Sequence, residues 1–135
     1  MENSDNTGPA GKTILIVDDE FGVLEVLEFI LRDAGFKVVT ALNGQDALSR
    51  LEEVMPDLII VDYMMPILDG LGVINAVRSD DGLRNVPIIL VSALPEQNVR
   101  ERCAGYDSFL RKPYKTEQLM DQISSLLART ESDGS

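Results

Sequence analysis

The sequence predicts an α/β fold built on a doubly wound, five-stranded parallel sheet. Three observations favour this class. Short apolar runs alternate five times with segments whose apolar residues recur at helical spacing. Strands that alternate with helices pair in parallel, and right-handed crossovers place the helices on both faces of the sheet. The chain has 135 residues, of which 44% are hydrophobic, and this is enough to bury the core of one domain.

The first two strands and helices follow from simple patterns. Residues 13–17 (TILIV) form an uninterrupted apolar run, which is typical of a strand buried on both faces. Residues 20–34 have helical periodicity, and Gly35 ends this helix. Its inward face is expected to carry Val23, Val26, Leu27, Ile30, Leu31 and Ala34. Residues 37–41 (KVVTA) are the second strand, and Asn43 can cap the second helix.

The second half of the chain repeats the alternation. The three remaining strands are expected over residues 57–61 (DLIIV), 87–93 (PIILVSA) and 107–111 (DSFLR). A third helix should begin near Asp69, and a short polar helical stretch should span residues 96–104. Thr116 can cap a last helix that carries an apolar stripe. This stripe consists of Leu119, Ile123, Leu126 and Leu127.

The relative polarity of the strands predicts their order. The first, third and fourth strands are the most apolar and should be central, whereas the second and fifth should lie nearer the edges. This arrangement matches the flavodoxin-like order 2-1-3-4-5, which has a switch point between strands one and three. We expect a disordered leader over residues 1–11, one domain over residues 12–129 and a disordered tail over residues 130–135.

Composition excludes several classes of function. The formal net charge of −11 argues against direct binding to nucleic acid or to an anionic membrane. The chain has no histidine, which removes histidine–metal sites and phosphohistidine chemistry on this chain. No apolar stretch is long enough for membrane insertion, and the leader has no apolar signal region. A single cysteine, Cys103, gives weak support for a cytoplasmic location.

Acidic residues follow two of the predicted strands. Asp62 ends the run from Leu58, just before Pro66 and Gly70 break regular structure, and Asp18 and Asp19 follow the first strand. Each could simply cap a turn or a helix. If the first and third strands are neighbours, however, three carboxylates converge on one edge and would repel one another. A Mg²⁺ ion, which prefers oxygen ligands, relieves this repulsion.

Two further polar residues are expected at the same edge. Ser92 ends the fourth strand, and Lys112 follows the fifth. An aspartate carboxylate can act as a nucleophile and form an acyl phosphate. A lysine and a hydroxyl beside it can then neutralise and orient the phosphoryl oxygens. The sequence therefore predicts phosphoryl transfer to Asp62, assisted by Mg²⁺, Lys112 and Ser92.

The motifs VDDE, VDYMMP…DG, VSA and FLRKPY together resemble the receiver domain of bacterial two-component response regulators. The resemblance covers residues 12–128, nearly the whole chain. It implies that Asp62 is the phosphoacceptor, and that Asp18 and Asp19 hold Mg²⁺, with Asp19 as a direct ligand. It assigns the remaining roles to the backbone carbonyl of Met64 (metal), Lys112 (phosphate), and Ser92 and Phe109 (conformational switch). It also implies a cis peptide bond before Pro113.

Two departures from the family pattern affect the expected output. The segment between Ser92 and Lys112 is short and has Pro95 near its start, so the fourth helix should be short, irregular or mobile. Phe109 stands where tyrosine is common. A standard output surface is therefore not expected to carry over without change.

These inferences lead to an expected function. We expect a single-domain response regulator, not a conventional enzyme, that takes a phosphoryl group from a histidine kinase or a His-phosphotransfer protein and acts on an unknown downstream protein. Two alternatives stay open: a relay or sink for phosphate within a phosphorelay, and a receiver-like binding module that is never phosphorylated. A phosphatase of the haloacid dehalogenase type is disfavoured, because Met64 stands where that family has a second aspartate.

Overall fold

The computed structural model describes residues 11–133 and contains one parallel sheet with the order β2-β1-β3-β4-β5. The strands are β1 (Thr13–Val17), β2 (Lys37–Ala41), β3 (Leu58–Asp62), β4 (Ile88–Ser92) and β5 (Ser108–Arg111). The fold class and the strand order are therefore confirmed. The expected leader, apart from Gly11, lies outside the described residues, and so do the last two residues of the expected tail.

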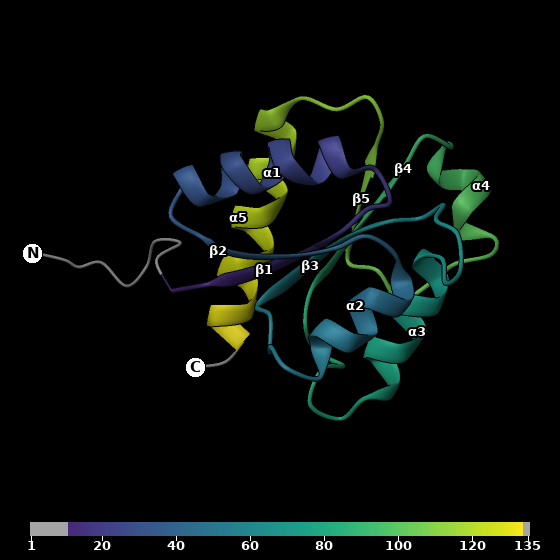
Figure 1. Ribbon diagram of the computed structural model, residues 1–135, viewed down its shortest axis with the longest axis horizontal. Helices are drawn as coiled ribbons and strands as arrows, with labels where there is room; N and C mark the ends of the chain where they lie inside the picture. The colour runs from purple at the N-terminus through teal and green to yellow at the C-terminus, as the bar shows by residue number, and fades with distance from the viewer. Residues whose placement is uncertain (1–10, 134–135) are drawn as a thin grey trace, which may run out of the picture.

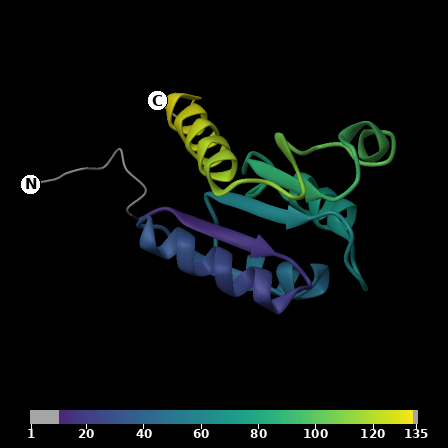
Figure 2. The same cartoon turned by 90° about the horizontal axis from the view of Figure 1, so that it is seen from above.

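Helices cover both faces of the sheet. They are α1 (Phe21–Asp33), α2 (Gly44–Leu51), α3 (Gly70–Ser79), α4 (Glu96–Arg100) and α5 (Thr116–Asp133). Helices α1 and α5 pack on one face, and α2, α3 and α4 pack on the other, so that alternate residues of each strand feed two separate cores (Figure 1). Helix α4 lies toward the end at which the strand arrows point (Figure 2). Among the described residues, no helix is long and apolar enough to cross a membrane.

The inward face of α1 is rotated relative to the predicted one. Leu24, Leu27 and Leu31 are buried, although Leu24 was not expected to be, and Val26 is 59% exposed. The assignment of Val26 to the core was wrong because α1 has apolar residues around most of its circumference. Hydrophobic periodicity then defines the helix well but its rotation about the axis poorly.

The ends of the later helices also differ from prediction. Thr116 is the first residue of α5 and not its cap; instead, the side chain of Gln118 accepts a hydrogen bond from the backbone N–H of Lys115. Helix α5 continues to Asp133, past the expected start of the tail at residue 130. The fourth helix is short, as predicted, and ends at Arg100.

The register of the strands brings their carboxyl ends to one edge. Val17 pairs with Val61, Asp62 with Val91, and Ser92 with Arg111. The ladder continues one residue further, where the Lys112 N–H donates to the Ser92 carbonyl over 2.8 Å. The polar residues that follow β1, β3, β4 and β5 are thereby placed around one small region.

Candidate functional site

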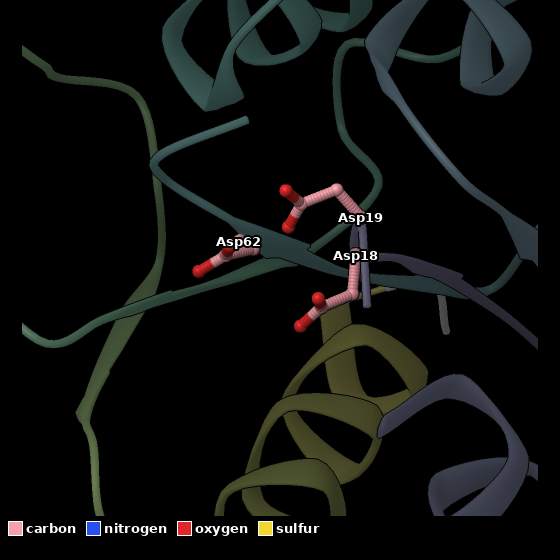
Figure 3. A group of neighbouring side chains, drawn as sticks. All are labelled: Asp18, Asp19 and Asp62. Carbon is pink, nitrogen blue, oxygen red and sulfur yellow. The ribbon is translucent and has the colours of Figure 1, made fainter. Parts of the chain in front are cut away.

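Three carboxylates meet at the carboxyl edge of the sheet. Asp18, Asp19 and Asp62 each offer an oxygen, and these oxygens lie within 4.8 Å of one another (Figure 3). Asp18 and Asp62 are buried, with exposed fractions of 4% and 7%, whereas Asp19 is exposed. The predicted convergence of the three residues is therefore present in the structure.

Local backbone geometry fixes these carboxylates. The Asp18 Oδ1 atom accepts a hydrogen bond from the Glu20 backbone N–H over 2.9 Å, which holds its side chain at the start of α1. After Asp62 the chain turns sharply, and the Gly70 N–H donates to the Tyr63 carbonyl over 2.9 Å. A Cβ atom at Gly70 would lie 2.9 Å from the Asp62 carbonyl oxygen, so only glycine fits this close approach without displacement.

A lysine from the loop after β5 reaches the same cluster. The Lys112 Nζ atom lies 3.3 Å from Asp62 Oδ1 and 3.7 Å from Asp18 Oδ2. The peptide bond between Lys112 and Pro113 is cis, as the resemblance implied. Lys112 thus pairs with two buried carboxylates, and the exposed carboxylate of Asp19 lies beside them, so these four side chains together carry a negative net charge when all are ionised.

The balance of burial and charge shifts the pKa values of the site. Burial, with a smaller contribution from Asp18, raises the pKa of Asp62 to about 6, although Lys112 acts to lower it. Burial likewise raises the pKa of Asp18. Burial lowers the pKa of Lys112, but the carboxylates of Asp62 and Asp18 outweigh this and raise it overall. Both buried carboxylates have thus lost solvation by water, and a hard cation that prefers oxygen ligands would compensate for this loss.

The other predicted site residues lie close to this cluster. Ser92 is 1% exposed, and its Oγ atom accepts a hydrogen bond from the Leu94 N–H over 3.0 Å. Among the described residues its hydroxyl hydrogen has no acceptor, so it can donate to a new group. Met64 lies in the loop after β3 with a side chain 64% exposed, and the role of its carbonyl stays a prediction. Phe109 lies half-buried on β5.

Two tyrosines near the site received no role from the sequence. The ring of Tyr106 lies 6.0 Å from that of Phe109, and its hydroxyl donates to Glu96 over 3.0 Å. Tyr114 is half-buried in the core under α1 and α5, near the charges of Lys112, Asp18 and Asp62. The position of Tyr114 directly after Lys-Pro in the FLRKPY motif could have indicated that it lies near the site. No pattern in the sequence indicated that Tyr106 contacts α4.

Comparison with known proteins identifies relatives of the same kind. The family model for the response regulator receiver domain matches residues 14–124. A transcriptional regulatory protein, PrrA from Mycobacterium leprae, is 39% identical over 128 residues, which are 92% of this chain and 53% of that protein. The chain therefore spans about half the length of this curated relative.

Two solved structures with similar folds contain magnesium. The receiver domain of a sensor histidine kinase from Pseudomonas aeruginosa PAO1, with a magnesium ion in its active-site cleft, has a TM-score of 0.81 at 33% identity and covers 88% of this chain and 99% of that one. The response regulator TrrA from Thermotoga maritima, in complex with Mg²⁺ and BeF, has a TM-score of 0.77 at 30% identity and covers 85% and 98%. The cluster of Asp18, Asp19 and Asp62 has the donor set expected of such a magnesium site.

Proposed function

Because the chain belongs to the response regulator receiver domain family, we propose that Asp62 accepts a phosphoryl group from a histidine kinase in a Mg²⁺-dependent reaction and that the phosphorylated chain acts on a protein partner. Receiver domains are phosphoacceptor modules of two-component signalling and not conventional enzymes. The observation that carries the proposal is the convergence of Asp18, Asp19 and Asp62 beside Lys112, which lies 3.3 Å from Asp62.

The residues of the site have complementary roles in this reaction. A carboxylate oxygen of Asp62 attacks the phosphorus of a phosphohistidine, the new O–P bond forms, and the N–P bond breaks with its electron pair on the imidazole nitrogen. The Lys112 ammonium leaves its pairing with Asp62 and neutralises one phosphoryl oxygen. The hydroxyl of Ser92 donates to another phosphoryl oxygen, since its hydrogen has no acceptor among the described residues.

The metal would be held by the acidic cluster. We propose that Asp18, Asp19, Asp62 and the carbonyl of Met64 provide its protein ligands. Bound Mg²⁺ would neutralise the negative charge that accumulates when a phosphoryl group approaches carboxylates. The pKa values of Asp18 and Asp62, which are raised mainly by burial, support this assignment, because a bound cation would compensate for the solvation that these carboxylates have lost.

The proposal is tested with a small acyl phosphate as donor, which removes the need for a particular kinase. With Mg²⁺ present, the protein should gain the mass of one phosphoryl group, and peptide mapping should place this group on Asp62. Chelation of Mg²⁺ or the change Asp62→Asn should abolish the gain, and Asp19→Ala should slow it about tenfold or more. Stable phosphorylation of Asp62→Asn at another residue would overturn the assignment.

A further inference from the structure

A cleft of about 650 Å³ opens beside the acidic site. One wall is the loop after β3, from residue 63 to residue 66, and the other is formed by Leu94, Asn98 and the residues that follow α4. The cleft joins apolar side chains to a charged rim. Met64 is 64% exposed and Leu94 is 37% exposed, so both present apolar surface that has no cover within the described residues.

The loop that forms the first wall holds an isoleucine in an unfavourable conformation. Ile67 has a φ of 74°, and the Leu68 N–H donates to the Pro66 carbonyl over 2.8 Å, so the loop makes a γ-turn centred on Ile67. A β-branched residue rarely adopts a positive φ. The side chain that this turn projects is 78% exposed and gains nothing from the core.

Packing from outside maintains this turn. The carbonyl of Leu68 lies so close to Gly44 in α2 that a Cβ atom on Gly44 would collide with it. Strain that neighbouring structure maintains is commonly associated with function. Folding alone does not require isoleucine here, since glycine or asparagine adopts a positive φ more readily. An exposed aliphatic side chain at the edge of an apolar cleft is instead suited to contact with another molecule.

The charge around the cleft selects the chemistry of the occupant. Its lining carries two acids, Asp69 and Glu101, against one base, Arg102. Tyr63, which lines the cleft, directly follows Asp62, so the acidic cluster of Asp18, Asp19 and Asp62 lies next to the cleft. The chain as a whole has a net charge of −11. A basic segment is therefore attracted to this surface, and an acidic one is repelled.

The ends of this chain do not have the required composition. Residues 1–10 (MENSDNTGPA) include Met1 as their only large apolar side chain and carry no basic residue. The last six residues (TESDGS) carry neither a large apolar nor a basic one. Neither of these two segments therefore matches the chemistry of the cleft.

We propose that this cleft, together with Ile67, is a docking site for a short segment of a partner protein that carries aliphatic side chains and at least one lysine or arginine. The existence of this docking site does not depend on phosphorylation of Asp62, but its regulation rests on the proposed function. Leu94 lines the cleft and donates to Ser92, which is placed to bind a phosphoryl group on Asp62, so phosphorylation would move one wall of the cleft.

A displayed library of short random peptides, panned against the purified protein, tests the chemistry without a known partner. Enriched peptides should combine aliphatic with basic residues, and the best one, made synthetically with a fluorescent label, should bind as measured by anisotropy. Its affinity should fall about tenfold for Asn98→Trp, whose side chain fills the cleft. The matched control Gln97→Trp lies on the same helix outside the lining and should keep full affinity.

Two further variants separate docking from a structural role. Ile67→Gly should raise the melting temperature, because it relieves the positive φ, and should still weaken peptide binding. Glu101→Lys should weaken binding of the basic peptide. Glu53→Lys, which makes the same charge change at an exposed residue outside the cleft, should leave this binding unchanged. The proposal would be overturned by enrichment of acidic peptides or by unchanged binding of the peptide to Asn98→Trp. It would also be overturned if the protein formed a dimer that Asn98→Trp dissociates, because the occupant would then be a second copy of this chain.

Failure of this inference and failure of the proposed function give different results. Phosphorylation by the small acyl phosphate is measured by intact mass on the wild type and on Asn98→Trp. If both are phosphorylated but no peptide distinguishes them, the docking site is wrong and the phosphoacceptor stands. If neither is phosphorylated but the peptide binds the wild type alone, the docking site stands without its proposed regulation.

Discussion

Asp62 combines a functional position with a charge that the fold tolerates poorly. Burial raises its pKa to about 6 from an ordinary value of 3.8, and Asp18 adds like-charge repulsion, although Lys112 opposes both. Between about pH 4 and pH 6 the folded chain therefore holds a proton that the unfolded chain has already lost. The contribution of Asp62 to the free energy of unfolding then falls as the pH rises through this window, since this group binds more protons in the folded state.

The change Asp62→Asn should therefore stabilise the metal-free protein. At pH 7 in the presence of a chelator, we expect the free energy of unfolding to rise by about 2 kcal/mol, and its dependence on pH between 4 and 6 to become weaker. Urea denaturation at a series of pH values measures both effects. Asp121→Asn, on an exposed residue of α5, is the control and should change neither. A less stable Asp62→Asn protein would show that Lys112 fully balances the carboxylate.

At the scale of single elements, α4 is the least firmly attached helix of the fold. It has five residues, and Val99 is its only buried one. Its first residue, Glu96, accepts a hydrogen bond from Tyr106 over 3.0 Å and pairs with Arg100 over 3.1 Å. Because Tyr106 also contacts the ring of Phe109, it links α4 to the residue predicted to switch. Local opening of α4 should therefore depend on this tyrosine.

The change Tyr106→Phe removes the hydroxyl and keeps the ring. Loss of one hydrogen bond to a charged acceptor should lower the free energy of local opening by about 1–2 kcal/mol and speed amide exchange in residues 96–103 several-fold. Hydrogen exchange followed by NMR measures this residue by residue. Tyr114→Phe is the control, since no hydrogen bond of its hydroxyl is present among the described side chains. Unchanged exchange in α4 would mean that Val99 alone holds the helix.

Helix α1 presents a second exposed apolar surface. Phe21, Val26 and Phe29 are exposed by 64%, 59% and 73%, and of these three only Val26 was expected on the inward face of the helix. Scattered exposed apolar residues are normal and need no explanation. Here three of them share one helix next to the site, which is consistent with docking of a histidine kinase.

Phe29→Ala should separate docking from chemistry. Transfer from a histidine kinase that phosphorylates the chain should fall about tenfold in kcat/KM, whereas phosphorylation by a small acyl phosphate should be unchanged. Met55→Ala, at a residue that is 61% exposed in the loop before β3, is the control for loss of exposed apolar surface. Equal loss with both donors would indicate a damaged fold and not a docking surface.

The predictions from sequence succeeded where one periodicity determines the structure. Strand runs and the cap at Asn43, whose side chain accepts from the Asp46 N–H over 2.8 Å, follow from local pattern. Residues at the strand ends also came together, because parallel strands share an edge. The distances from Lys112, the contact of Tyr106 with Glu96, and the γ-turn at Ile67 depend on how loops pack, and no periodicity encodes that. The rotation of α1 about its axis was predicted wrongly for a related reason, since this helix has apolar residues around most of its circumference.

At the scale of the whole molecule, the two edges of the sheet differ in how completely their charged groups are paired. The carboxyl edge concentrates buried carboxylates and strained backbone around Asp62. The amino edge holds a satisfied network in which Arg78 donates to the carbonyls of residues 84, 86 and 105 and to Asp107, all over 2.7–2.8 Å. Asp107 in turn accepts from the N–H of Ile88, the first residue of β4. The Arg78 side chain thus joins α3 to the loops before β4 and β5, and Asp107 extends this network to the first residue of β4.

Arg78→Gln should lower stability without impairing the site. The variant loses a charge-assisted bond to Asp107 and most of the carbonyl contacts, so the free energy of unfolding should fall by about 2–3 kcal/mol. Arg84→Gln, which removes only a 3.8 Å pair between side chains more than half exposed, should change it by about 0.5 kcal/mol or less. Both variants should still be phosphorylated by a small acyl phosphate at the wild-type rate at a temperature where they are folded. A slower reaction of folded Arg78→Gln would mean that the two edges are coupled through β4, since β4 is the element that carries Ile88 at one end and Ser92 at the other.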